Sequence, residues 1–169
     1  MGRGSQLALE SGLVRNVKRV NRDDASTPGI EVRAKFTQPD HPIAYGYPPV
    51  TSVFRSNYGI YDPPKKWLTA SYCTSCLDGP YDFSHVVLQW GTKDFDSSDS
   101  GSSEPPLIVS GGGKKVDFIQ GRPAILDMPE GKGHVVVFNF NPMHRDMNYS
   151  DFRLLWNGIL NYQHIVKGK

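Results

Sequence analysis

The chain carries little net charge and contains no long apolar run, and each absence argues against one class of function: nucleic-acid binding and membrane insertion. Its formal net charge of +2 comes from 19 basic and 17 acidic residues, and the basic residues are scattered along the sequence. Nucleic-acid binding is therefore not expected, because it needs a concentrated basic surface. No apolar run approaches the roughly 20 residues that cross a bilayer, so membrane insertion is not expected either.

Several motifs of known chemistry are also missing. None of the five histidines belongs to a His-x-x-Glu pair, so the chain cannot house the zinc chemistry of a metallocarboxypeptidase. The glycine-rich residues 111–115 lack the spacing of a phosphate-binding loop, and we interpret them as a flexible turn. No cofactor is expected.

The length and composition indicate one domain with long connections. A chain of 169 residues falls within the usual range for a single domain, and we treat residues 1–169 as one unit. Its 17 glycines and 13 prolines favour turns and loops. Residues 94–106 are polar and low in complexity, so we expect a mobile, solvated loop there.

The first two thirds of the sequence read as one short helix followed by short strands. A helix is expected at residues 5–11, closed by Gly12, because glycine suits the left-handed conformation that ends helices. Extended segments with β-branched and aromatic residues predict a β-rich, loop-rich middle. These predicted strands are residues 17–20, 31–36, 51–55, 67–72 and 86–90.

The last third has the clearest pattern. Two apolar runs, residues 123–128 and 134–140, are joined by Pro-Glu-Gly-Lys-Gly, which predicts an antiparallel hairpin. The second run is apolar on both faces, so we expect a central strand. A helix should follow and cover one face of the sheet, since apolar residues recur there with helical spacing. These are Phe152, Leu155, Trp156, Ile159 and Leu160.

Four stretches of the sequence, in this order and spacing, resemble a known family. They are His-Pro-Ile-Ala-Tyr-Gly at 41–46, Gly-Arg-Pro-Ala at 121–124, Gly-Lys-Gly-His-Val-Val-Val-Phe at 131–138, and Asn-Pro-Met-His-Arg at 141–145, which runs into Phe-Arg-Leu-Leu-Trp-Asn at 152–157. The family is the glutamine-amidotransferase-like domain at the C-terminal end of some bacterial zinc carboxypeptidases of the M14 type. The similar region covers about the C-terminal two thirds of the chain.

This resemblance implies an α/β fold with a partial flavodoxin-like, class I amidotransferase-like sheet. It places an upstream carboxypeptidase domain before the present chain and implies that the first strands of the appended sheet are missing. A sheet cut in this way exposes an edge, so we expect it to be covered by a homodimer partner. Proteins of this kind are usually exported, which implies a secreted or periplasmic location.

A glutamine amidotransferase uses a cysteine, a histidine and a carboxylate. In the resemblance, Ser5 lies near the position of the nucleophile, and His144 and Asp146 follow the last strand. We expect no catalysis from them, because no cysteine is near. Open α/β sheets bind ligands beyond the carboxyl ends of their strands, so the expected contact residues are Asn141, His144 and Arg145. Arg145 could instead cap a helix or pair with an acid of the same chain.

The Cys73-x-x-Cys76 pair has three interpretations: a structural pair of thiols or a local disulfide, half of a zinc site, or a redox pair. We favour the structural one, because a zinc ion would need two further ligands and only His85 is near. No metal is expected.

The sequence therefore predicts a non-catalytic accessory or interaction domain of a zinc-carboxypeptidase-type protein. Two alternatives remain open. One is a residual amidotransferase or hydrolase that uses His144. The other is a free-standing module that binds a peptide or a carbohydrate.

Overall fold

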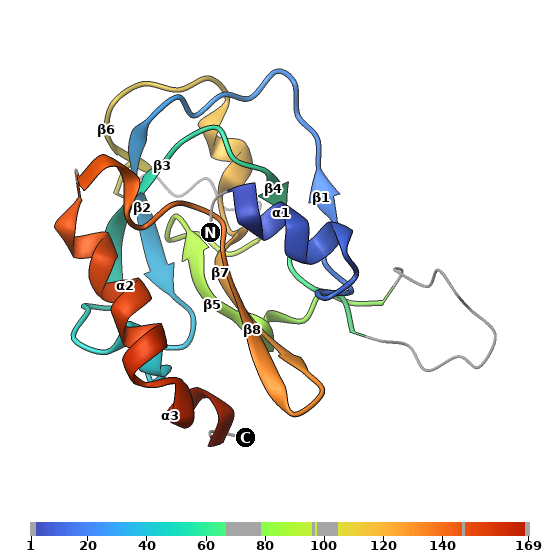
Figure 1. Ribbon diagram of the computed structural model, residues 1–169. Helices are drawn as coiled ribbons and strands as arrows, with labels where there is room; N and C mark the ends of the chain where they lie inside the picture. Colours follow the sequence, from blue (N-terminus) through green and yellow to red (C-terminus); the bar gives the residue numbers. More distant parts are fainter. Residues whose placement is uncertain (1–2, 67–78, 96, 98–104, 147, 168–169) are drawn as a thin grey trace.

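The computed structural model describes residues 3–66, 79–95, 97, 105–146 and 148–167 (Figure 1). Its main feature is a curled antiparallel sheet with strand order β3-β2-β5-β7-β8, on which β6 also pairs with β2. The strands are β2 Ile30–Phe36, β3 Val50–Arg55, β5 Val86–Trp90, β6 Ile108–Ser110, β7 Pro123–Glu130 and β8 Gly133–Phe138. A separate two-stranded ladder joins β1 Arg19–Val20 to β4 Ile60–Tyr61.

Among the described residues, three α-helices lie around the sheet: α1 Arg3–Glu10, α2 Tyr149–Leu160 and α3 Tyr162–Lys167. Short 3-10 turns, labelled η1 to η4, occupy Pro42–Ala44, Phe83–His85, Val116–Ile119 and His144–Asp146. No helix in the described part of the chain has the length and apolar character needed to span a membrane.

The pairing of the strands agrees with the general part of the predicted fold class but not with its flavodoxin-like sheet. An α/β fold with helices beside a sheet is present, and so is the hairpin of β7 and β8, which pair antiparallel from Ile125↔Phe138 to Glu130↔Gly133. The flavodoxin-like sheet is not confirmed, because a flavodoxin-like sheet is built mainly from parallel strands. Every named strand pair among the described residues is antiparallel.

Most of the local predictions are confirmed. Helix α1 ends at Glu10, two residues before Gly12, which adopts φ +73°. Strands β2, β3 and β5 match the predicted segments within one residue. In β2 the alternation of apolar and charged residues buries Ile30, Val32, Ala34 and Phe36 on one face. The strand predicted at 17–20 is shorter. The strand predicted at 67–72 and most of the loop predicted at 94–106 fall outside the described residues.

The prediction that residues 134–140 form a central strand is wrong. Strand β8 is the last strand in the described sheet order, with β7 as its partner. Its two faces are nevertheless both in apolar surroundings, since Phe138 joins the main core and Val137 packs in a second cluster with Val14 and Leu126. Contacts with α1 on one side and α3 on the other explain the apolar pattern without a second neighbouring strand.

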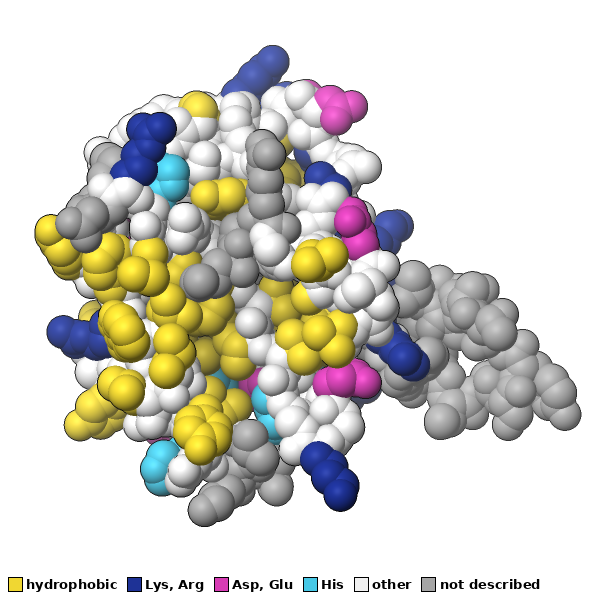
Figure 2. All heavy atoms as spheres, in the orientation of Figure 1, with side chains coloured by type: hydrophobic (Ala, Val, Ile, Leu, Met, Phe, Trp, Pro, Cys, Tyr) yellow, Lys and Arg dark blue, Asp and Glu magenta, His cyan; other side chains and the backbone are white. Residues whose placement is uncertain are grey.

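Helix α2 is present as predicted, but it buries a different face. Its buried residues are Asp151, Leu154 and Asn157. The predicted apolar stripe points outward: Trp156 is 49% exposed and Leu160 is 74% exposed. Figure 2 shows hydrophobic side chains gathered over the α2 side of the molecule. The helix is rotated in this way because Asn157 donates its amide hydrogens to the carbonyls of Ile43 (2.9 Å) and Tyr45 (2.8 Å).

Two glycines with positive φ provide a test of the packing. A Cβ at Gly121 (φ +71°) would lie 2.4 Å from the backbone nitrogen of Phe95, whereas a Cβ at Gly131 (φ +58°) would meet nothing within 4 Å. We expect Gly121→Ala to lower the free energy of unfolding by about 2–5 kcal/mol, and Gly131→Ala by only about 1–2 kcal/mol. Urea unfolding of both variants measures the difference. Equal losses would contradict the close approach of residues 95 and 121.

Candidate functional site

The structure places the three predicted ligand residues in the turn between β8 and α2, but it does not gather their side chains into one site. The side-chain oxygen of Asn141 accepts a hydrogen bond from the backbone of Met143 at 3.1 Å. The ring of His144 stacks on Phe54, with 4.8 Å between ring centroids. Arg145 is exposed and adopts φ +51°. His144 is therefore held by packing, and Arg145 is directed to solvent.

The catalytic candidates are likewise held by different parts of the fold. Ser5 is buried in α1, with its Oγ 3.2 Å from the hydroxyl of Tyr61 on β4. His144 packs on β3 instead. Asp146 lies in η4 beside His144, and its side chain falls outside the described part of the chain. None of the described contacts joins Ser5 to His144.

The metal candidates cannot be assembled into a site from what the structure describes. Cys73 and Cys76 lie outside the described residues. The Nε2 atom of His85 lies 3.9 Å from a carboxylate oxygen of Asp82, and its Nδ1 is buried without a hydrogen-bond partner in the described structure. Among the described residues, no group of three or more His, Cys, Asp and Glu side chains is arranged to hold a metal ion.

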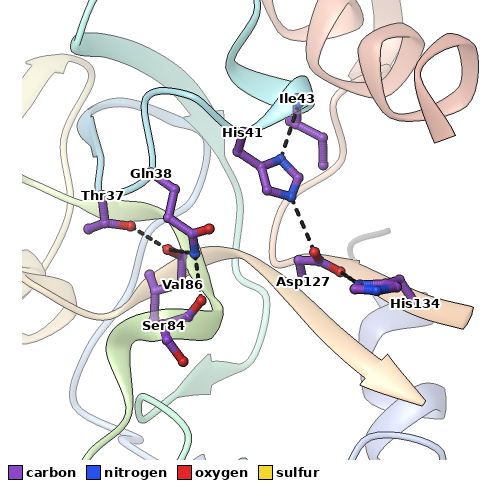
Figure 3. Close-up of polar contacts among 8 residues, drawn as sticks. All are labelled: Thr37, Gln38, His41, Ile43, Ser84, Val86, Asp127 and His134. Atoms are coloured by element: carbon purple, nitrogen blue, oxygen red, sulfur yellow. Dashed lines mark hydrogen bonds and ion pairs between the residues drawn. The ribbon is translucent and has the colours of Figure 1, made fainter. Parts of the chain in front are cut away.

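A different cluster of polar side chains lies in the interior. Asp127 on β7 is shared by two histidines: its Oδ2 lies 3.2 Å from Nε2 of His41, and its Oδ1 lies 2.7 Å from Nδ1 of His134 (Figure 3). The three side chains are 5%, 7% and 11% exposed, in the order Asp127, His41 and His134. We call these residues the His-Asp-His cluster.

A backbone hydrogen bond fixes the tautomer of the His41 ring. The amide of Ile43 donates to Nδ1 of His41 at 3.2 Å, so this nitrogen is an acceptor and carries no proton. The proton of the neutral ring is therefore on Nε2, where it is donated to Asp127. This bond arises because His41 caps η1, whose first residue is Pro42. A local turn thus sets the tautomer of a side chain that reaches a distant strand.

The two histidines keep Asp127 ionised. Burial by itself raises the pKa of Asp127, but hydrogen bonds from His41 and His134 lower it by more, so its pKa lies below the ordinary value. A buried carboxylate that accepts two hydrogen bonds orients both rings. Because His134 uses Nδ1 for Asp127, its Nε2 remains to serve as an acceptor or a base.

The cluster lies between two cavities. The first, about 350 Å³, is largely apolar and lies between β8 and the two C-terminal helices; it is lined by His134, Val136, Phe138, Leu155, Gly158, Ile159, Tyr162 and Ile165. The second, about 540 Å³, is lined on the other side by His41, Asp127, His164, Ile165 and residues 37–40 and 42.

This arrangement can bind a ligand or accept a proton, but the first cavity lacks the side chains that most often serve as the nucleophile of a hydrolase. Among its lining residues there is no Ser, Thr, Cys or Lys side chain. A hydrophobic cavity with one oriented polar group is typical of a binding site.

Sequence reasoning missed the His-Asp-His cluster, although one signal for it was present. Asp127 interrupts the apolar run Ala-Ile-Leu-Asp-Met, and a carboxylate at an interior strand position needs partners. The identity of those partners depends on tertiary contacts 86 and 7 residues away.

A second buried carboxylate lies near the predicted ligand residues. Asp151, in the first turn of α2, accepts a hydrogen bond from the backbone of Phe54 at 3.0 Å through Oδ2. Its Oδ1 is buried and has no hydrogen-bond partner in the described structure. Burial raises the pKa of Asp151 to about 7, and the nearby Glu31 adds to this effect, while the Phe54 amide opposes it.

The shared carboxylate should matter for stability. We expect Asp127→Ala to lower the free energy of unfolding by about 2–5 kcal/mol at pH 7, because two buried imidazole N–H groups lose their acceptor. Since the pKa of Asp127 is lowered on folding, its contribution is present above about pH 4 and is lost as the pH falls through the folded-state pKa. Urea unfolding at pH 7 and pH 3 measures both effects. Asp94→Ala, at a mostly exposed carboxylate, is the control.

Asp151 should behave in the opposite way. Its pKa is raised on folding, so its contribution is fully present below the unfolded value near pH 4 and is lost as the pH rises through about 7. Asp151→Asn should therefore gain stability relative to the native chain between pH 4 and pH 8, by on the order of a few kcal/mol. Thermal unfolding across this range tests it, with the exposed Asp40→Asn as control. A gap that stays constant with pH would contradict the raised pKa.

Comparison of the chain with protein-family models, with curated proteins and with solved structures finds no match. The function must therefore be argued from the residues themselves. Two features of this structure bear on it most directly: the His-Asp-His cluster beside its apolar cavity, and the exposed apolar side of α2.

Proposed function

We propose that the chain is a non-catalytic accessory domain of a zinc-carboxypeptidase-type protein, and that it contacts the catalytic domain through the exposed side of α2 and α3. We call this surface the α2–α3 face and define it by Leu155, Trp156, Ile159, Leu160 and Tyr162. The observation that carries the proposal is the exposure of four of these residues: Trp156, Ile159, Leu160 and Tyr162. The helix has the apolar periodicity of a core element, yet this side is uncovered in the described structure.

The extent of the face supports binding to another protein. Trp156, Ile159, Leu160 and Tyr162 are between 49% and 74% exposed. Leu155, Ile159 and Tyr162 also line the apolar cavity between β8 and the two helices, so the face continues into that cavity. Aromatic residues around an apolar pocket are common at protein interfaces, and contiguous apolar patches are uncommon elsewhere on protein surfaces.

The resemblance to amidotransferase-like domains supplies the identity of the partner. It supports a carboxypeptidase domain of the same protein as that partner, and with it an exported location. The β7–β8 hairpin and α2 agree with the resemblance, whereas the antiparallel pairing of β2, β3 and β5 does not support its flavodoxin-like sheet. A homodimer through the same face is the alternative partner.

A residual hydrolase is the second candidate function, and the Asp127–His134 pair favours it. A carboxylate that holds Nδ1 of a histidine is the arrangement that orients the general base in hydrolases. The proposal of a binding domain is preferred because the cavity at His134 has no Ser, Thr, Cys or Lys side chain among its lining residues.

The reading frame upstream of Met1 gives the first test. The proposal expects it to continue into a metallopeptidase domain that contains a His-x-x-Glu pair. In that longer protein, amide hydrogen exchange in α2 should be slower than in the present chain alone, because a docked partner suppresses local opening. Equal exchange in the two forms would remove the proposal.

Two matched variants test the face itself. Leu160 on α2 and Leu7 on α1 are both exposed helical leucines, at 74% and 69%. We expect Leu160→Glu to abolish the protection of α2 in the longer protein and Leu7→Glu to leave it unchanged. Light scattering on the present chain tests the alternative partner. A dimer that Leu160→Glu dissociates would mean that the face binds a second copy of the chain and not a carboxypeptidase domain.

A further inference from the structure

A third cavity, of about 360 Å³, has a chemical character unlike the two beside the His-Asp-His cluster. It lies between the β1–β4 ladder and the end of β3, and most of its lining is polar. Four of its lining side chains are cationic: Arg19, Arg22, Arg55 and Lys115. We call it the Arg55 cavity.

Arg55 is buried with its positive charge. Its side chain is 1% exposed. Within the described part of the chain, its guanidinium donates only to backbone carbonyls: Asn139 at 3.3 Å, Tyr58 at 3.1 Å and Gly59 at 3.4 Å. The Nε atom is buried and has no hydrogen-bond partner in the described structure. Trp90 lies 5.0 Å from the guanidinium, measured to the ring centroid.

A buried cation normally has an acidic partner, because an unpaired charge in the interior is costly. Arg55 forms no ion pair with any described carboxylate, and the titratable groups that act on its pKa are the hydroxyls of Tyr61 and Tyr58. Burial lowers the pKa of Arg55 to about 10, which still leaves it charged at neutral pH. The site therefore has a positive charge that no described side chain balances.

The remaining charges around the cavity do not balance it either. Arg22 and Lys115 both pair with Asp24, the former at 2.8 Å through Nε. Arg19 has no ion-pair partner among the described residues, and Asp23 is the one carboxylate that lines the cavity. Four cations against Asp23 and Asp24 leave an excess of two positive charges.

The fold holds this arrangement in place. Lys114 exchanges backbone hydrogen bonds with Ser26 at 2.8 and 2.9 Å, which fixes the glycine-rich turn against the cavity wall. Lys115 then adopts φ +48° and lines the cavity. A Cβ at Gly113 would lie 2.7 Å from the carbonyl of Ser26, so this approach requires glycine. The turn that the sequence suggested was merely flexible thus carries a cation to the site.

We infer that the Arg55 cavity binds a small molecule that carries a phosphate monoester group. A phosphate dianion matches the excess of two positive charges, and guanidinium groups suit its oxygens because they donate several hydrogen bonds in one plane. The volume leaves room for an organic part beside the phosphate. Asn57 and Tyr58, which also line the cavity, offer polar contacts for that part.

The experiment is a titration of the isotopically labelled chain followed by amide NMR. Inorganic phosphate and ribose 5-phosphate are the probes, citrate is the carboxylate arm, and sodium chloride at equal ionic strength controls for screening. We expect saturable shifts confined to residues 19–27, 55–60 and 113–116, with ribose 5-phosphate bound more tightly than phosphate. Tighter binding of citrate, or shifts without saturation, would overturn the inference.

Variants separate a specific site from general attraction to positive charge. Arg19→Ala and Lys115→Ala change exposed side chains that line the cavity, and each should weaken binding of ribose 5-phosphate about tenfold. Lys18→Ala removes an exposed charge next to Arg19 that does not line the cavity, and its affinity should match that of the native chain. An equal loss in all three variants would reduce the effect to nonspecific electrostatics and refute the site.

Discussion

The side-chain amide of Asn157 fixes the orientation of α2 and therefore determines which of its side chains are exposed. It donates to two carbonyls of the turn around η1, which seats α2 and fixes its rotation. The same turn positions His41, whose ring bonds to Asp127, and Asp127 in turn holds His134 at the apolar cavity. A single buried amide on α2 therefore links the orientation of the helix to the polar cluster inside the sheet. The exposure of Trp156 and Leu160 follows from the same contact.

Two buried charged groups of the described structure, Asp127 and Arg55, are compensated in different ways. The carboxylate of Asp127 accepts hydrogen bonds from two imidazoles, so its charge is stabilised by hydrogen bonding within the chain. The guanidinium of Arg55 has carbonyl dipoles and an aromatic ring around it but no counter-charge among the described residues. Interiors tolerate charge when it is paired or hydrogen-bonded. The first site is complete in this sense, and the second is open to an anion.

Sequence patterns predicted the elements better than their arrangement. The hairpin, β2, β3, β5, α1 and α2 were expected from periodicity and turn residues, because these signals are local. The edge position of β8 and the buried face of α2 were not, since both depend on what packs against them. In α2 the two polar residues Asp151 and Asn157 are buried where periodicity would place apolar ones. The candidate residues Asn141, His144 and Arg145 lie close together in the sequence. The His-Asp-His cluster instead combines positions 41, 127 and 134.

The packing of α1 has a consequence for how the chain is made. Ala8 and Leu9 of the first helix pack with Val135 and Val137 of the last strand, and Tyr61 meets Ser5 from the middle of the chain. During synthesis the contacts of this helix with β8 cannot form until β8 has left the ribosome. Because closing such distant contacts is entropically costly, we expect the chain to fold more slowly than a chain of equal length whose contacts are mostly local.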